Sequence, residues 1–540
     1  MISTFKKRNR SQSLLVFWAL SSALAGFLFG FDTVVISGAE KQIQDLWSLS
    51  GSMHGWALSA ALWGTVIGAL LGGIPTARFG RKKVLLSIGI LYLVSALGSA
   101  LAGQVSAFII FRFVGGLGVG ASTIAAPLFI SEISPAKNRG KLAGLFQFNI
   151  VFGILVAYLS NFLIGHIASE AFAWRWMLGV EAIPALIYSA LAFTLPESPR
   201  WLITHAGKRE QGAKVFARIN PGMPEVEIEE LVKEVESTVA VNGAKSRFWT
   251  KRLSIPITLA VLIAFFNQLS GINVILYFAP RLLDLAGLPN ALAASVSLGI
   301  TNLIFTFAGL WLIDRLGRRA LLYIGSLGYI ISLGVCAAMF LNFTEFKVVS
   351  TAIDLVGASE KVIKLEMGEG HYSEADKQNI YVEFAAARLS LSEDSEKEGY
   401  EGAPVLIPED TSPGEILEIA QKAKMDSSGL LGVNSLIVLI CIIVFMASHA
   451  IGQGAVIWVF ISEIFPNDHR AAGQSLGSFT HWMFAALLTL LFPIAIKNID
   501  AGFIFAFFSL MMIIQLIWIR LMVPETKGKT LEQIEKSLGL

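Results

Sequence analysis

The sequence has little cysteine, little histidine and little charge. Its 540 residues include two cysteines and seven histidines, and only 15% of them are charged, against about 25% in soluble domains. Cys336 and Cys441 both lie in apolar runs, so we expect no disulfide framework and no cysteine metal site. The histidines are scattered, and no nucleophile–base set or metal-ligand spacing is present, which argues against an enzyme, a bound metal or another cofactor. The net charge of +2 disfavours a nucleic-acid partner.

Long apolar runs dominate the chain instead. Hydrophobic residues make up 54% of it, and a helix that crosses a bilayer needs about 20 mostly apolar residues. The first run is too long for a signal-peptide core and no small-residue cleavage site follows it, so we expect it to stay in the mature protein. The sequence therefore predicts an all-α membrane protein. Its expected spans are 14–38, 53–75, 84–103, 105–131, 141–166, 174–195, 254–279, 291–313, 320–343, 433–462, 471–496 and 501–523.

Lysine and arginine gather in connections on one side of the expected membrane. They occur at 6–10, at 78–83 and at 315–319. If the spans alternate in direction, all three segments lie on the same side, which the positive-inside bias makes the cytoplasm. The same side holds 197–252, whose charge spacing is typical of short solvated helices. Both ends of the chain are therefore expected in the cytoplasm.

Three motifs recur in the same order in the two halves of the chain. The second and third motifs are 65 residues apart in the first half and 62 in the second, but the first and second are 53 and 147 residues apart. The excess of 94 residues locates an insertion between the ninth and tenth spans. The motif pairs are Arg78-Phe-Gly-Arg-Lys82 with Arg315-Leu-Gly-Arg-Arg319, Ser131-Glu-Ile with Ser462-Glu-Ile, and Pro196-Glu-Ser with Pro524-Glu-Thr.

The insertion, 344–432, differs in charge from the rest of the chain. It holds 18 acidic and 8 basic residues, so that the remainder has a net charge of +12. Alternation of the spans places it outside the cytoplasm, where acidic residues meet no positive-inside bias. Helical spacing at 352–366 and 414–424, with an extended stretch at 404–408, favours a small folded cap over a disordered tether. Three roles are open for it: capturing substrate, binding a partner in the cell envelope, or covering the outer mouth.

Glutamates and arginines of the repeated motifs lie near the expected cytoplasmic ends of the helices. Ion pairs between them would lock helices in one arrangement and release them in another. Taken alone, each basic loop has the alternative role of a topology signal, but its recurrence in both halves favours the charge network. The residues of this expected network are Gly80, Arg81, Glu132, Arg139, Arg318, Glu463 and Arg470.

Seven motifs occur in the order found in one family. They are Phe29-Gly-Phe-Asp32, Arg78-Phe-Gly-Arg-Lys-Lys83, Arg112-Phe-Val-Gly-Gly, Pro196-Glu-Ser-Pro-Arg-Trp-Leu202, Gln268-Leu-Ser-Gly-Ile-Asn273, Ser462-Glu-Ile-Phe-Pro466 and Pro524-Glu-Thr-Lys-Gly-Lys-Thr530. The sequence resembles the sugar porters of the major facilitator superfamily, which include bacterial proton-coupled symporters for xylose, arabinose and galactose and facilitative glucose transporters. The resemblance covers nearly the whole chain outside the insertion.

The resemblance implies a central sugar site lined by polar and aromatic residues of both halves. Amides and imidazoles can return to sugar hydroxyls the hydrogen bonds that these lose from water, and tryptophans offer flat faces to a sugar ring. Each residue has the alternative role of cross-linking or packing helices. The expected site residues are Phe29, Gln147, Asn267, Gln268, Asn273, Asn302, Trp458, His481 and Trp482.

Three positions depart from the family pattern. Asn267 stands where the family often has the first of two glutamines, and His481 stands where the bacterial xylose symporter has glutamine. These two departures leave the identity of the sugar open. Ala77 replaces a frequent acidic residue, which removes one expected member of the charge network in the first half.

Asp32 is the only acidic residue of the first expected span, and Arg112 in the fourth is its candidate partner. A buried carboxyl whose arginine approaches and withdraws can load and release a proton, and the resemblance implies the same role. A purely structural ion pair is the alternative. The resemblance also implies that Glu181 helps to couple helix ends, and Tyr277 and Phe278 are candidates for an outer gate.

The sequence thus predicts a major facilitator fold of two six-helix halves, with an extracytoplasmic insert between helices 9 and 10. The expected function is import of a pentose or hexose by proton symport through a bacterial inner membrane. Alternatives are a facilitative uniporter and a non-transporting sugar sensor. The expected domains are the N-terminal half 1–196, the linker 197–252, helices 7–9 in 253–343, the insert 344–432, helices 10–12 in 433–523 and the tail 524–540.

Overall fold

The computed structural model describes residues 2–135, 139–220, 222–241, 247–368, 374–466, 468–529 and 531–539, and in these ranges helices are the only regular elements. The first eleven helices are α1 Ile2–Leu46, α2 Gly51–Leu71, α3 Gly73–Phe79, α4 Arg81–Leu101, α5 Val105–Ile133, α6 Arg139–Ile167, α7 Glu170–Gly179, α8 Ala182–Thr194, α9 Pro199–Thr204, α10 Arg209–Ile219 and α11 Glu225–Val241. The others are α12 Ser254–Leu269, α13 Ile272–Leu285, α14 Ala291–Leu316, α15 Arg318–Asn342, α16 Thr344–Glu366, α17 Glu374–Ser395, α18 Pro413–Leu431, α19 Val433–Ile451, α20 Gln453–Ile464, α21 Arg470–Asn498, α22 Ala501–Met522 and α23 Leu531–Ser537.

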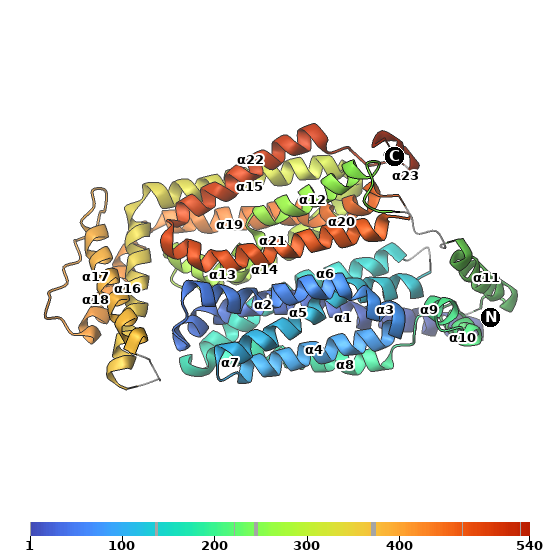
Figure 1. The fold of residues 1–540 in the computed structure, drawn as a ribbon, viewed down its shortest axis with the longest axis horizontal. Helices are drawn as coiled ribbons and strands as arrows, with labels where there is room; N and C mark the ends of the chain where they lie inside the picture. Colours follow the sequence, from blue (N-terminus) through green and yellow to red (C-terminus); the bar gives the residue numbers. More distant parts are fainter. Residues whose placement is uncertain are drawn as a thin grey trace.

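Twelve segments among these residues are long and apolar enough to span a bilayer, which confirms the predicted number. Three of the spans consist of two helices each, namely α7 with α8, α12 with α13, and α19 with α20. The remaining spans are α1, α2, α4, α5, α6, α14, α15, α21 and α22. The spans before residue 196 and those after residue 253 form two bundles that lie one against the other (Figure 1).

The interface between the two bundles is built by α2 against α21 and α6 against α14. Small residues allow these helices to approach. A Cβ atom added to Gly55 would lie 2.1 Å from the carbonyl oxygen of Leu490, and one added to Gly51 would lie 3.3 Å from that of Pro493. Van der Waals packing of small residues is a main source of helix association in lipid, so this close approach stabilises contact between the bundles.

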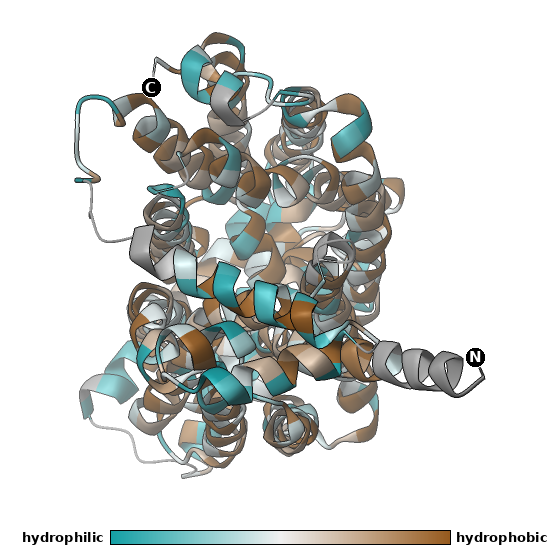
Figure 2. Cartoon of the chain, turned by 90° about the vertical axis from the view of Figure 1, so that its right-hand side faces the viewer, coloured by the Kyte–Doolittle hydropathy of each residue, from teal (hydrophilic) through white to brown (hydrophobic). Residues whose placement is uncertain are grey.

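The two ends of the molecule differ. Helices α9, α10 and α11, both chain termini and α23 lie at one end, and α16, α17 and α18 lie at the other (Figure 1). We call these the linker end and the insert end. The expected short helices of 197–252 are therefore present, and they carry hydrophilic faces at the linker end (Figure 2).

The segment between α15 and α19 folds as three helices. The helical spacing at 352–366 and 414–424 falls within α16 and α18, while α17 was not predicted. Val348, Leu355, Leu391 and Ile416 form a separate apolar core for this segment. Because the segment has its own core, it is a folded cap and not a tether.

Candidate functional site

A break in the seventh span places three amides together. Gly271 adopts φ +86°, a left-handed conformation that ends α12 and starts α13, and glycine takes it without a side-chain clash. Gln268 Nε2 donates to Asn267 Oδ1 at 3.0 Å, and Asn273 Nδ2 donates to Gln268 Oε1 at 2.7 Å. All three amides are buried. Because buried amides need partners, this arrangement forms a polar patch that can exchange its internal bonds for bonds to a polyhydroxyl ligand.

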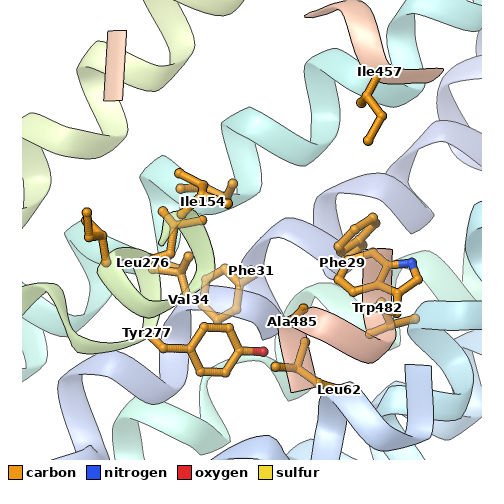
Figure 3. Packing of buried hydrophobic residues seen from close by; sticks show 14 of the residues in the cluster. Phe29, Phe31, Val34, Leu62, Ile154, Leu276, Tyr277, Ile457, Trp482 and Ala485 are labelled. Carbon is orange, nitrogen blue, oxygen red and sulfur yellow. The ribbon is translucent and has the colours of Figure 1, made fainter. Parts of the chain in front are cut away.

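Aromatic side chains of α20 and α21 adjoin the amide patch. The His481 ring lies 3.1 Å from Gln268 Nε2, 5.3 Å from the Trp458 ring centroid and 4.7 Å from that of Trp482. Trp482 reaches the other bundle, because its ring lies 5.5 Å from that of Phe29 on α1. Figure 3 shows Phe29 and Trp482 side by side between the bundles. The group therefore offers flat apolar faces next to hydrogen-bonding groups.

Two expected site residues lie on the helices that form the other seam between the bundles. Asn302 on α14 is buried and accepts from Thr306 Oγ1 at 3.4 Å. Gln147 on α6 is half-buried. With Phe29 on α1, Gln147 belongs to the first bundle, whereas all the other expected site residues belong to the second.

Asp32 and Arg112 form a buried ion pair inside the first bundle. Arg112 donates through Nη1 to Asp32 Oδ1 at 2.5 Å and through Nη2 to the Asp32 carbonyl at 3.2 Å. The side chains are 2% and 1% exposed. A Cβ atom added to Gly115 would lie 2.3 Å from Ser95 Oγ and 3.8 Å from Asp32 Oδ1. The glycine therefore allows α5 to approach Ser95 on α4 closely beside the ion pair.

Glu181 lies beside this ion pair. It stands at the break between α7 and α8, is 1% exposed, and interacts electrostatically with both Asp32 and Arg112. The break in the sixth span places the carboxyl in the bundle interior. The role in coupling helix ends that the resemblance implies stays a prediction.

Two matching charge clusters lie at the linker end. Arg81 donates through Nε and Nη2 to Glu132 at 2.8 and 2.7 Å, and Arg318 donates in the same way to Glu463 at 3.1 and 2.7 Å. Each arginine also donates to a carbonyl five residues earlier, that of Thr76 or that of Ile313. The repeated sequence motifs therefore form two clusters with the same hydrogen-bond geometry.

Each cluster has a second glutamate that the sequence analysis did not assign. Glu197 accepts from the backbone N–H of Arg81 at 2.8 Å, and Glu525 accepts from that of Arg318 at 3.1 Å. Both carboxylates lie at the N-terminus of a helix, where the helix dipole stabilises negative charge. The repeat of Pro-Glu-Ser and Pro-Glu-Thr was the available signal. Gly80, which precedes Arg81, has φ +90°, and a Cβ there would lie 2.3 Å from Glu197 Oε2.

Arg470, a member of the expected network, forms no ion pair with Glu463 among the described residues. Its Nε and Nη2 have no hydrogen-bond partner in the described part of the chain. Both oxygens of Glu463 are already taken, by Arg318 and by the Thr526 hydroxyl at 2.7 Å. The side chain of Arg139 lies outside the described residues.

Tyr277 and Phe278 pack between the bundles toward the insert end. They are 1% and 0% exposed, and the Phe278 ring lies 4.5 Å from that of Phe492 on α21. Tyr158 on α6 donates to the carbonyl of Leu276 at 3.0 Å. Tyr277 points into the interface in Figure 3. Both residues therefore fill space between the bundles on the insert-end side of the central group, and their role as an outer gate stays a prediction.

The comparisons with known proteins agree with this architecture. A family model described as sugar (and other) transporter matches residues 18–356 and 419–538, so it passes over most of the insert. The arabinose-proton symporter of Bacillus subtilis is 28% identical over 98% of this chain and 96% of its own length. The D-xylose-proton symporter of Escherichia coli is also 28% identical, over 96% and 94%.

Solved structures give the same result. The chain matches a partially occluded inward open conformation of the E. coli xylose transporter XylE with a TM-score of 0.69 and 28% identity, over 96% of this chain and all of that one. The fold is therefore that of the major facilitator superfamily. With the family model covering most of its residues, the protein belongs to the sugar (and other) transporter family.

Proposed function

We propose that the protein imports a monosaccharide together with a proton by alternating access. The observation that carries the proposal is the buried Asp32–Arg112 ion pair, which lies one helical turn along α1 from Phe29. Phe29 in turn contacts Trp482 of the aromatic group. A proton-binding group therefore adjoins the candidate sugar site. The relatives named as arabinose-proton and D-xylose-proton symporters support both the substrate class and the coupling.

The proposed sugar site combines the amide patch with the aromatic group. Gln268 and Asn273 would exchange their mutual hydrogen bond for bonds to sugar hydroxyls, and Trp458 or Trp482 would cover the apolar face of the ring. Phe29 and Gln147 contribute from the first bundle. A sugar bound to both bundles favours the arrangement in which they come together, which is how binding drives alternating access.

Proton coupling follows from the two states of Asp32. In one state, the carboxylate is paired with Arg112 at 2.5 Å. If transport moves Arg112 away, the buried carboxyl favours its neutral form and takes up a proton. One charge moving through a potential of 100 mV supplies about 2.3 kcal/mol, which corresponds to roughly 50-fold accumulation.

We further propose that the linker end faces the cytoplasm and the insert end the outside of an inner membrane, in the domain division expected from the sequence. Basic loops and both termini at the linker end support this orientation. The contacts of Gly51 and Gly55 with α21 bring the bundles together near the insert end. The structure then corresponds to a state that is closed on the outside.

The proposal is tested with purified protein in liposomes. Labelled-sugar uptake, competition by a panel of pentoses and hexoses, and proton entry recorded by a pH electrode are measured in the same vessel. We expect a pH gradient, acid outside, to drive accumulation above equilibrium and a protonophore to abolish it. If sugar only equilibrates across the membrane and the protonophore has no effect, the protein is a facilitative uniporter instead. If sugar binds without uptake, the protein is a sensor.

For the insert we propose a cap outside the membrane, available to a partner in the envelope. Its core is separate from that of the bundles, and the family model does not include 357–418. Deleting 350–428 and measuring uptake separates the roles. Loss of uptake with intact folding indicates an essential part in transport, whereas unchanged uptake indicates an accessory role.

A further inference from the structure

A second buried charge group lies near the insert end, away from the central site. Glu40 on α1, His54 on α2 and Arg281 on α13 meet there. Glu40 Oε2 lies 3.3 Å from His54 Nε2 and 3.4 Å from Arg281 Nη1. The side chains of Glu40 and His54 are 2% and 0% exposed. Glu40 is eight residues after Asp32, about 12 Å further along the helix, so the group is separate from the Asp32–Arg112 pair.

Glu40 and His54 are suited to hold one proton between them. An imidazole is the side chain that titrates nearest to neutral pH, and here it faces a carboxylate at 3.3 Å. Both ring nitrogens of His54 are buried without a hydrogen-bond partner among the described residues, and the His54 ring lies edge-on to that of Phe278, with 6.4 Å between the ring centroids. No hydrogen bond in the described part of the chain therefore fixes the imidazole in one protonation state.

Arg281 joins this pair from the opposite bundle. Glu40 and His54 belong to the first bundle, while Arg281 belongs to the second and also donates to Gln44 Oε1 at 2.8 Å. A nearby arginine favours the deprotonated form of a carboxyl. If the insert end opens, α13 separates from α1 and this positive charge is withdrawn from Glu40, while water gains access. The remaining pair then binds a proton more readily.

Other charged groups surround the trio and must be separated from it in any test. Asp284 on α13 pairs with Lys424 of the insert at 2.7 Å and lies 3.9 Å from Lys41. Asp354 on α16 interacts electrostatically with Arg281, Lys497 and Lys41. The charged groups facing the trio are Lys41 and Asp45 on α1, Asp284 on α13, Asp354 and Lys361 on α16, and Lys424 on α18.

We propose that Glu40 and His54 form a second proton-binding site, at the gate of the insert end, which takes up a proton when the gate opens and releases it when Arg281 returns. The proton comes from and goes back to the solution on the insert side, so it adds nothing to the number of protons transported. Acid on that side then favours the open gate, because closure requires the proton to leave. The inference rests on the proposed function, which supplies the opening and closing.

The experiment measures gate opening and not transport. Spin labels are attached to cysteines at Met53 and Asn498, both exposed at the insert end, in a background with Cys336→Ala and Cys441→Ala. Distances between the labels are recorded in lipid nanodiscs at pH 5.5 and pH 7.5. We expect the fraction of long distances to rise in acid, by at most about tenfold per pH unit for one linked proton. Glu40→Gln and His54→Gln should each remove the shift.

Two carboxyl variants serve as matched controls. Asp354→Asn, close to Arg281, and Asp410→Asn, on the exposed surface of the insert, should both retain the shift. Absence of a shift in the parent, its persistence in Glu40→Gln and His54→Gln, or its loss in Asp354→Asn would each overturn the inference. The proposed function fails by a different result, namely sugar uptake that ignores the protonophore.

Discussion

At the scale of single residues, the protein places a few charged and polar side chains where lipid and packed helices exclude water. An unpaired charge in such a place costs several kcal/mol, so each buried charge indicates either a partner or a function. Asp32 has its partner in Arg112. Two hydrogen bonds join the amides of Asn267, Gln268 and Asn273, so these buried groups have partners within their own span.

Asp32→Asn should abolish sugar accumulation while sparing exchange of sugar across the membrane. The amide keeps the size of the side chain but cannot carry the proton, so sugar movement is no longer coupled to the pH gradient. Uptake against a gradient and counterflow exchange are measured in the same liposomes. Asp410→Asn on the exposed surface of the insert is the control, and full accumulation in the Asp32 variant would refute the coupling role.

Gln268→Ala should raise KM for sugar with a smaller effect on kcat. Two hydrogen bonds to the substrate, at about 1 kcal/mol each, correspond to a rise on the order of 30-fold. Initial uptake rates over a range of sugar concentrations give both constants. Gln421→Ala, on an exposed face of α18, should change neither, and an unchanged KM in the Gln268 variant would exclude the amide from the site.

At the scale of elements, helix ends and helix breaks decide where functional groups lie. The break at Gly271 turns one span into α12 and α13 and brings Gln268 to Asn273. At the linker end, glycines with φ near +90° precede α4 and α15, and a glutamate from a distant segment caps each helix. In both cases, a glycine backbone conformation determines where the polar side chains meet.

Gly80→Ala should destabilise the protein and weaken the linker-end cluster. Alanine at φ +90° costs about 1–2 kcal/mol, and its Cβ would meet Glu197 at 2.3 Å. Thermal unfolding in detergent gives the stability change. Gly73→Ala is the matched control, because nothing lies within 4 Å of an added Cβ there; equal stability of the two variants would contradict the capping argument.

Ser412→Ala should loosen the start of α18. Ser412 and Glu415 form a capping box, and loss of such a cap costs about 1 kcal/mol. Hydrogen exchange of the first turn of α18 measures the effect, and Ser412→Asp should restore protection.

The same cap makes the stability of the start of α18 depend on pH. Hydrogen bonds from Ser412 lower the pKa of Glu415, so the stabilisation is present above the ordinary pKa of a glutamate and disappears as the pH falls through the lowered value. Protection of α18 that is independent of pH below 4.5 would contradict this account.

At the scale of the whole molecule, two bundles meet in a state that is closed near the insert end. The contacts of α2 with α21 close that end, and the Glu40–Arg281 pair reinforces the closure. The charge clusters at the linker end lie within single bundles. They therefore hold each bundle together without joining the two.

A disulfide between Gly51→Cys and Ile494→Cys, with the native cysteines replaced, should stop transport until it is reduced. A Cβ on Gly51 lies 3.5 Å from Ile494 Cα, which is close enough for a bond with small adjustments, and a covalent link there prevents opening. Uptake is measured before and after a reductant. Each single-cysteine variant should transport normally, and undiminished uptake in the oxidised pair would show that this end need not open.

The sequence by itself determined the spans and the repeated motifs, located the insert, and predicted which residues would line the site. The length of an apolar run and the charge of its flanking loops are local properties of the chain, and the repeated motifs keep their order. These features can therefore be predicted without a structure. The sequence also predicted the ion pair between Asp32 and Arg112, because few charged residues occur within spans and each needs a partner.

Only the tertiary structure decided which charged groups meet. Glu463 binds Arg318 and not Arg470, Glu181 joins the Asp32 pair, and Glu40 meets His54 and Arg281. These contacts join residues far apart in the chain, and they depend on helix rotation and on breaks within spans. Neither composition nor residue spacing specifies the rotation of a helix or the position of a break. Rotation is set by the packing of small and large side chains between neighbouring helices.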